Sequence, residues 1–314
     1  MHRVIVALVA ALSLLLTGCA GRQHGEDRLL EGRVVHEGVE RRYLIYVPPG
    51  LDDRSAPRPV VLALHGGGGT ALGMVRLTLG RFNQLADEHG FYVVYPQGVG
   101  NSWNDGRGDV SSRAHAERID DVGFISVLIA HLQSEYPVDS RRIFATGISN
   151  GGLMSFRLAC SLPGTIRSIA PVTASIPTEI AESCMQGSGV GLVLFNGTDD
   201  PLVPYDGGQI RVFGKDRGEV LSTTETIRIF VARNGCANNA EKTEMADRSD
   251  DGTRVVSFAY PDCRSESEVL LYRIEGGGHT WPGGFQYLSE RLIGRTSRDI
   301  NTCDEIWRFF ADSQ

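Results

Sequence analysis

A short buried strand that runs into a glycine-flanked turn and then a helix is the feature that most constrains this fold. The apolar residues Ile143 to Ala145 predict the strand, which leads into Gly147-Ile148-Ser149-Asn150-Gly151. Glycine at both flanks lets the chain reverse sharply, because a side chain there would crowd the turn. We therefore expect Ser149 in a strained backbone conformation at a helix N-terminus, with its hydroxyl standing clear of the strand.

The rest of the chain alternates strands and helices, which predicts an α/β fold. An antiparallel hairpin around Glu37-Gly38 opens the domain, a helix runs from about Leu77 to Glu88, and Ser222-Thr223-Thr224-Glu225 is a capping box. Such alternation implies a mostly parallel central sheet with helices on both faces. We expect one domain over residues 31–314, and the short connection 174–188 leaves no room for a large lid. The strands expected after the hairpin are 59–65, 91–95, 143–145, 166–172, 189–195, 254–260 and 268–274.

The first residues are typical of an export signal. Arg3 precedes an apolar stretch from Val4 to Leu16, which is too short to span a bilayer comfortably. Leu16-Thr17-Gly18-Cys19 resembles the bacterial lipobox, which implies a signal peptide over 1–18, an acylated Cys19 and a flexible tether over 19–30. The alternative is an ordinary secretory signal with a chance cysteine. The chain is thus expected at the cell envelope, anchored to a membrane through Cys19, or secreted.

The positions of the cysteines and the net charge of the chain indicate which disulfides, ligands and partners to expect. Export favours disulfides, and we favour Cys236 with Cys263, because the first ends a helical segment and the second lies in a polar turn. Cys160 with Cys184 is a second possibility. With Cys19 set aside, five cysteines remain, so at least one of them stays free or pairs outside the chain. No cysteine has metal-ligand spacing, so we expect no metal site. A net charge of -7 argues against a nucleic-acid partner, and a monomer is the default expectation.

A serine hydroxyl becomes a useful nucleophile only beside a base that is oriented by a carboxylate. Asp199 and Asp200 follow one predicted strand, and from the residues alone either could be that carboxylate. His279 follows another strand and is preceded by three glycines, a setting that is unusual for a core histidine. The order serine, acid, histidine matches that of the α/β-hydrolases.

Donors for a developing oxyanion are expected from two places. The N–H of Asn150 lies at the start of the helix that follows Ser149, where the helix dipole favours negative charge. The second N–H is expected from Gly66 or Gly67, because His65-Gly66-Gly67-Gly68 follows a strand at the position where esterases carry such a loop. Trp103 and Trp281 are interpreted as lining a substrate pocket, with packing as the alternative for both.

The motifs together resemble one branch of the α/β-hydrolases, the polyhydroxybutyrate-depolymerase-like and feruloyl-esterase group (carbohydrate esterase family 1). The resemblance implies a serine ester hydrolase without a cofactor, selects Asp200 over Asp199, and supports the Cys236–Cys263 pair. It covers about residues 33–310 and is carried by the motifs 64–68, 95–98, 120–124, 147–152, 197–200 with 203–205, and 278–283.

Two departures from the family pattern concern the loops around the site. Asn196 stands where relatives often have histidine, and the loop 101–105 lacks the paired cysteines that often follow it. Because of the second departure, the sequence does not select between feruloyl or acetyl polysaccharide esters and short hydroxyalkanoate polyesters as the substrate. It also does not indicate whether the ester is polymeric or small. Two other functions remain as alternatives: a serine peptidase of the same fold, and a non-catalytic surface lipoprotein that binds glycans or polyesters.

Overall fold

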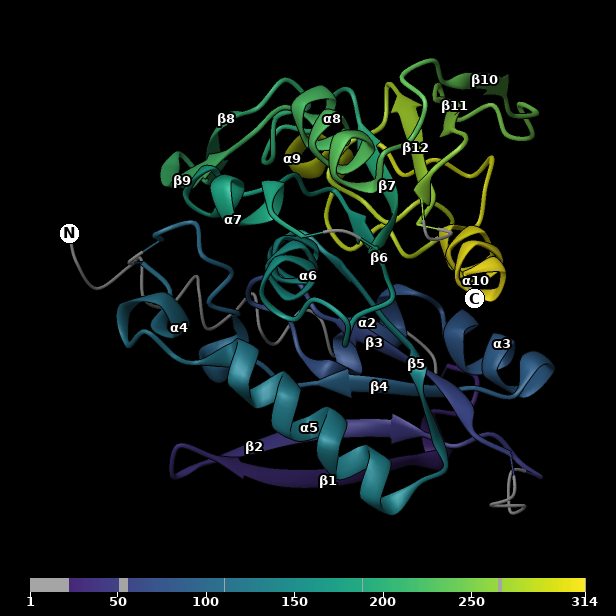
Figure 1. The fold of residues 1–314 in the computed structure, drawn as a ribbon. Coiled ribbons are helices and arrows are strands. Elements are labelled where there is room, and N and C mark those ends of the chain that lie inside the picture. The colour runs from purple at the N-terminus through teal and green to yellow at the C-terminus, as the bar shows by residue number, and fades with distance from the viewer. Residues whose placement is uncertain (1–22, 51–55, 110, 188, 265–266, 314) are drawn as a thin grey trace.

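A ten-stranded sheet forms the centre of the molecule (Figure 1). The computed structural model describes residues 23–50, 56–109, 111–187, 189–264 and 267–313. The strand order is β1-β2-β4-β3-β5-β6-β7-β12-β11-β10, and the strands from β4 to β12 in that order are parallel to one another. The antiparallel strands β1 and β2 flank one edge, and β11 and β10 flank the other. The strands are β1 Leu29–His36, β2 Val39–Tyr46, β3 Arg58–Leu64, β4 Tyr92–Pro96, β5 Val138–Ile148, β6 Ser168–Val172, β7 Gly191–Gly197, β10 Glu241–Glu244, β11 Arg254–Tyr260 and β12 Val269–Glu275.

Helices cover both faces of this sheet, because side chains of a buried strand alternate between two hydrophobic cores. On β3, Val60 and Leu62 face one core, whereas Val61 and Ala63 face the other. Helices α5, α6 and α8 pack into the first core, and α2, α3 and α10 into the second. The helices are α2 Ala71–Leu77, α3 Arg81–His89, α4 Arg113–Ala116, α5 Asp121–Glu135, α6 Asn150–Ser161, α7 Ala181–Met185, α8 Thr223–Asn234, α9 Glu290–Ile293 and α10 Thr302–Asp312, with 3-10 turns η1 Glu26–Arg28, η2 Val99–Asn101 and η3 Thr178–Ile180. The predicted α/β architecture is confirmed.

Two local expectations need correction. The helix expected over 77–88 begins later, at Arg81 in α3, and Leu77 is the last residue of α2, because Leu79 and Gly80 adopt left-handed φ angles of 54° and 68° between the two helices. The end of the predicted tether is folded: Glu26 pairs with Arg76 at 2.6 Å, and β1 begins at Leu29. The predicted signal peptide and Cys19 lie outside the described residues.

A small hairpin that the sequence did not predict follows the Asp200 loop. Strands β8 (Gly208–Val212) and β9 (Lys215–Val220) form a separate two-stranded sheet. Phe213 and Gly214 at its tip both have positive φ angles, 50° and 74°, as a tight hairpin turn requires. Between β6 and β7 the residues that the structure describes form only η3 and α7, in keeping with the expected absence of a large lid there.

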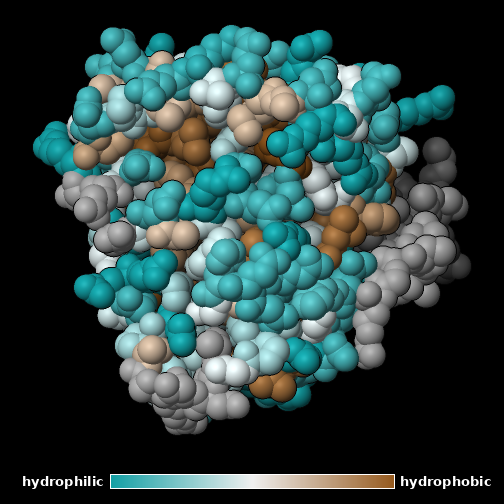
Figure 2. Space-filling model, turned by 90° about the vertical axis from the view of Figure 1, so that its right-hand side faces the viewer, coloured by the Kyte–Doolittle hydropathy of each residue, from teal (hydrophilic) through white to brown (hydrophobic). Residues whose placement is uncertain are grey.

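Two disulfides join neighbouring helices and loops. Cys160 at the end of α6 pairs with Cys184 in α7, and Cys236 after α8 pairs with Cys263. These are the two pairings expected from the sequence, and Cys303 is buried as a free thiol. The face of the molecule in Figure 2 is mainly hydrophilic, with apolar patches between the polar side chains. Within the described part of the chain, no helix has the length and apolar character needed to cross a bilayer.

Candidate active site

The turn from β5 to α6 has the strain that its sequence predicts. Ser149 has φ 55° and ψ -122°, a conformation that residues with a side chain rarely adopt. Its N–H donates to the carbonyl of Val172 at 2.9 Å, which ties the turn to β6. A methyl group on Gly151 would lie 2.3 Å from the Leu64 carbonyl oxygen, so only glycine permits α6 to approach β3 this closely. The serine is therefore presented at the carboxyl edge of the parallel strands, where α/β folds place their sites.

His279 and Asp200 meet at the same edge of the sheet. The Nδ1 atom of His279 lies 2.7 Å from Oδ2 of Asp200, and both side chains are at most 3% exposed. The other oxygen of Asp200 accepts the N–H groups of Leu202 at 2.8 Å and Val203 at 2.9 Å, so this buried carboxylate is fully paired. Asp199 is exposed and bonds the hydroxyl of Thr198 instead. The structure thus brings Asp200, and not Asp199, to the histidine.

The loop of His279 is held from both sides. Tyr287 donates its hydroxyl to the carbonyl of His279 at 2.9 Å, and the N–H of His279 donates to the carbonyl of Ile293 in α9. A methyl group on Gly278 would lie 2.1 Å from that same Ile293 oxygen, which explains one of the glycines before the histidine. Burial, followed by the nearby Asp200 carboxylate, raises the pKa of Tyr287, so its hydroxyl stays a donor.

No hydrogen bond joins Ser149 Oγ to His279 among the described residues. The two side chains follow β5 and β12, which are separated in the sheet by β6 and β7. The Nδ1 atom of His279 faces Asp200, so its Nε2 atom is the one left to accept a proton. Catalytic hydrogen bonds between nucleophile and base are often long before substrate binds and tighten in the complex.

The glycine loop after β3 lies against the serine turn. A methyl group on Gly66 would lie 3.7 Å from Cβ of Ser149, and one on Gly67 would lie 3.7 Å from Cβ of Asn150. Asn150, which begins α6, is 1% exposed. The predicted oxyanion donors are therefore gathered around the predicted nucleophile.

Both tryptophans that were interpreted as substrate contacts are completely buried. Trp103 donates its indole N–H to the carbonyl of His65 at 2.9 Å, and Trp281 packs edge-on against Phe82 with ring centroids 6.1 Å apart. A ring without exposed surface cannot stack on a substrate unless its neighbours move. The structure therefore favours packing, the alternative interpretation, for both residues.

A buried carboxylate behind the site had no signal in the sequence. Asp105 accepts a hydrogen bond from Nδ2 of Asn150 at 2.6 Å and lies 2.9 Å from Nε2 of His115. Burial alone would raise the pKa of Asp105, but Arg107, His115 and Asn150 together lower it below its ordinary value. Arg107 and His115 are near Asp105 in the sequence, but Asn150, which links it to the site, is 45 positions away, so no local motif could have identified its role.

The departure at position 196 has a structural role beside the site. Nδ2 and Oδ1 of Asn196 pair with the carbonyl and the N–H of Ala174, both at 3.0 Å, so this side chain ties the end of β7 to the loop after β6. A second bond runs from Nδ2 to the hydroxyl of Thr223 at 2.9 Å.

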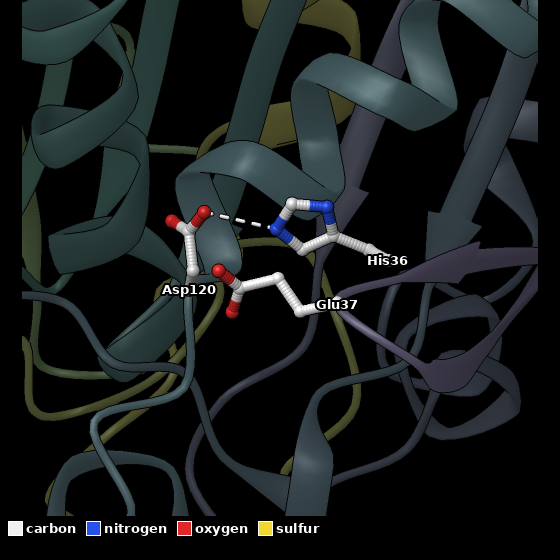
Figure 3. Close-up of side chains that lie close together, drawn as sticks. All are labelled: His36, Glu37 and Asp120. Atoms are coloured by element: carbon white, nitrogen blue, oxygen red, sulfur yellow. Dashed lines mark hydrogen bonds and ion pairs between the residues drawn. The ribbon is translucent and has the colours of Figure 1, made fainter.

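One group of residues in the described chain has the composition of a metal site. His36, Glu37 and Asp120 each offer a ligand atom, and these atoms lie within 4.8 Å of one another (Figure 3). Nε2 of His36 already lies 2.9 Å from one oxygen of Asp120, and the other oxygen caps α5 by accepting the N–H of Gly123 at 2.9 Å. A helix N-terminus also repels a cation. We interpret the group as a tie between the β1–β2 turn and α5.

This chain is similar to several proteins whose names identify them as esterases. NocK of Nocardia uniformis subsp. tsuyamanensis, a protein assigned as an esterase, is 31% identical over 280 residues, which cover 86% of this chain and 79% of NocK. Feruloyl esterase C of Emericella nidulans is 25% identical over 243 residues, 76% of each chain. The solved structure of an acetyl xylan esterase from Aspergillus awamori has a TM-score of 0.59 and 16% identity, and the match covers 90% of this chain and 99% of that one. No family model matches the chain.

Proposed function

The chain belongs to the α/β-hydrolase esterases of the feruloyl-esterase group, and we propose that it hydrolyses esters with Ser149 as nucleophile, His279 as base and Asp200 as orienting carboxylate. The buried His279–Asp200 hydrogen bond carries this proposal. A carboxylate on Nδ1 holds the imidazole in one tautomer, leaves Nε2 free as a base, and stabilises the imidazolium that forms. The strained turn at Ser149 supplies the nucleophile at the same sheet edge.

The reaction proceeds in two steps. His279 takes the proton of Ser149 as the oxygen attacks the ester carbonyl, and the alcohol leaves with that proton. Water, activated by the same imidazole, then releases the acid from the acyl-enzyme. The N–H groups of Asn150 and of Gly66 or Gly67 stabilise the oxyanion in both steps, a contribution of about 3 to 4 kcal/mol per donor in a comparable site. No step requires a cofactor.

Replacement of the nucleophile tests the mechanism. We expect Ser149→Ala to lower kcat on 4-nitrophenyl acetate by more than about a thousandfold, with an unchanged melting temperature. Ser134→Ala is the matched control, because Ser134 is exposed in α5 and bonds only a carbonyl of its own helix. An Ser149→Ala variant that keeps its activity, or wild-type protein that fails to react with a fluorophosphonate probe, contradicts the assignment.

The substrate that we propose is a feruloyl or acetyl ester on a polysaccharide. Sequence relatives carry the names feruloyl esterase and acetylxylan esterase/xylanase, which supports this choice. Methyl ferulate, acetylated xylan and hydroxybutyrate oligomers, compared at equal enzyme, separate the possible substrates. Faster release from the hydroxybutyrate oligomers than from the other two contradicts the proposal and favours a polyester.

We also propose that the chain is exported and carries lipid on Cys19. The lipobox-like sequence before Cys19 and the two disulfides, which fit an oxidising compartment, support this. In cells fed an alkyne fatty acid, wild-type protein should become labelled and Cys19→Ser should not. Equal labelling of both proteins contradicts lipidation at this cysteine. We expect a monomer, which light scattering after size exclusion of residues 23–314 checks.

A further inference from the structure

Three segments that are distant in the sequence meet behind the oxyanion donors. They are the end of β3 at His65, the loop that contains Trp103, and the start of α6 at Asn150. Trp103 contacts both of the others and is completely buried. Its role is separate from that of the triad, because its hydrogen bonds go to His65 and Asn150 and not to Ser149, Asp200 or His279.

The backbone of Trp103 clasps the side chain of Asn150 at two points. The N–H of Trp103 donates to Oδ1 of Asn150 at 2.7 Å, and Nδ2 of Asn150 donates to the carbonyl of Trp103 at 2.9 Å. The same Nδ2 bonds Asp105 at 2.6 Å, so the amide group is held in one orientation. The first residue of α6, which offers one oxyanion N–H, is therefore attached to the Trp103 loop.

The side chain of Trp103 holds the other half of the oxyanion site. Its indole N–H donates to the carbonyl of His65 at 2.9 Å, and its ring lies over the His65 imidazole with centroids 4.9 Å apart. Nε2 of His65 accepts the N–H of Gly98 at 3.0 Å, so the proton of the neutral ring lies on Nδ1, which is 2.8 Å from the carbonyl oxygen of Gly66.

The Gly66 carbonyl belongs to the same peptide group as the N–H of Gly67, one of the two candidate oxyanion donors on this loop. In a trans peptide the C=O of one residue and the N–H of the next point in opposite directions. Nδ1 of His65 and the N–H of Gly69, at 3.0 Å, both hold the Gly66 oxygen. The N–H of Gly67 in that peptide is thereby turned to the opposite side. The orientation of this N–H depends on His65, and the position of His65 depends on Trp103.

We propose that Trp103 is a positioning residue that sets the spacing between the two oxyanion donors, one on α6 and one on the loop after β3. The inference rests on the proposed function of Ser149. Trp103 does not need to touch substrate for this role, which accounts for its complete burial beside the site. Its loss should weaken stabilisation of the transition state and leave the binding of the ground-state ester unchanged.

The test is Trp103→Phe, which keeps an aromatic ring and removes the N–H that bonds His65. We expect kcat on 4-nitrophenyl acetate to fall about tenfold to a hundredfold while KM changes less than about twofold, because full loss of one oxyanion donor costs about 10²–10³ in kcat. The rate ratio of an ester to its thionoester should also fall, because a C=S group uses these donors poorly. Trp307→Phe is the matched control. Trp307 is a buried residue of α10, and its ring stacks on that of Phe91 with centroids 3.9 Å apart. It should leave kcat, KM and the ratio unchanged.

A second variant keeps the test decisive if Trp103→Phe does not fold. Benzothienylalanine at position 103 replaces only the indole N–H by sulfur and should give the same loss of kcat. Unchanged kcat in a folded variant overturns the proposal, and so does a raised KM at unchanged kcat, which would place Trp103 in the substrate pocket. If the Ser149→Ala variant keeps the activity of wild type, the proposed function itself is wrong. Failure of the Trp103 proposal and failure of the proposed function therefore give different results.

Discussion

A buried neutral histidine beside the oxyanion loop should make the stability of this protein depend on pH in a specific way. His65 is 1% exposed, and burial lowers its pKa to about 4, although the hydrogen bond to Gly66 acts in the opposite direction. In the unfolded chain the same imidazole titrates near its ordinary value of about 6.5.

The sign follows from the proton count of the two states. Between about pH 6.5 and pH 4 the unfolded chain binds a proton at His65 and the native protein does not, so the free energy of unfolding decreases as pH falls. The stabilisation is fully present above about pH 6.5 and is lost as pH approaches 4. The difference between the two pKa values corresponds to about 3 kcal/mol.

Urea unfolding of wild type and His65→Gln at pH 7, 5.5 and 4 measures this contribution. The variant lacks the titrating ring, so its free energy of unfolding should be lower at pH 7 but should depend less on pH. The gap between the two proteins should narrow by about 3 kcal/mol as pH falls to 4. Ser134→Ala, a change at an exposed position in α5 that removes no titrating group, should keep the pH dependence of wild type. Equal pH dependence in wild type and His65→Gln, or an NMR titration of His65 near pH 6.5, refutes the reasoning.

Two further changes test the site and the scaffold. Asp200→Asn should lower kcat about 10⁴-fold with little change in KM, because the amide favours the wrong tautomer of His279. Steady-state kinetics on 4-nitrophenyl acetate measures both constants, and an unchanged kcat would exclude Asp200 as the orienting carboxylate. The double change Cys236→Ser with Cys263→Ser removes a disulfide that closes a loop of 27 positions, and it should lower the free energy of unfolding by about 3 to 4 kcal/mol. Urea unfolding measures this difference, and a loss below about 0.5 kcal/mol would show that the disulfide does not restrict the unfolded chain.

Local sequence was sufficient for most of the framework. Short apolar runs predicted the parallel strands, because a strand that is covered on both faces needs no polar side chains. The Glu37-Gly38 hairpin was also readable, since both residues adopt the positive φ angles, 48° and 75°, that a tight hairpin turn requires. By contrast, β10 has only exposed residues and therefore no apolar pattern, and it was missed. The β8–β9 hairpin was missed as well, because β8 contains only two apolar residues, Ile210 and Val212, which are too few to predict a strand.

The residues around the site divide in the same way. Gly147, Ser149 and Gly151 carry their own signal because the turn they form is a property of five consecutive residues. The choice between Asp199 and Asp200 needed the family resemblance, and only the folded chain shows which carboxylate meets His279. The interpretation of Trp103 and Trp281 changed because burial depends on residues from other segments.

The amino-acid sequence by itself determined most of the buried strands, the strained serine turn and the chemical types available at the carboxyl ends of the strands, because these depend on neighbours along the chain. The tertiary structure alone decided which of these groups are paired: Asp200 with His279, Asn150 with Trp103 and Asp105, and Trp103 with His65. Each of these pairs joins residues at least 38 positions apart, and contacts at that separation exist only once the strands have taken their order in the sheet.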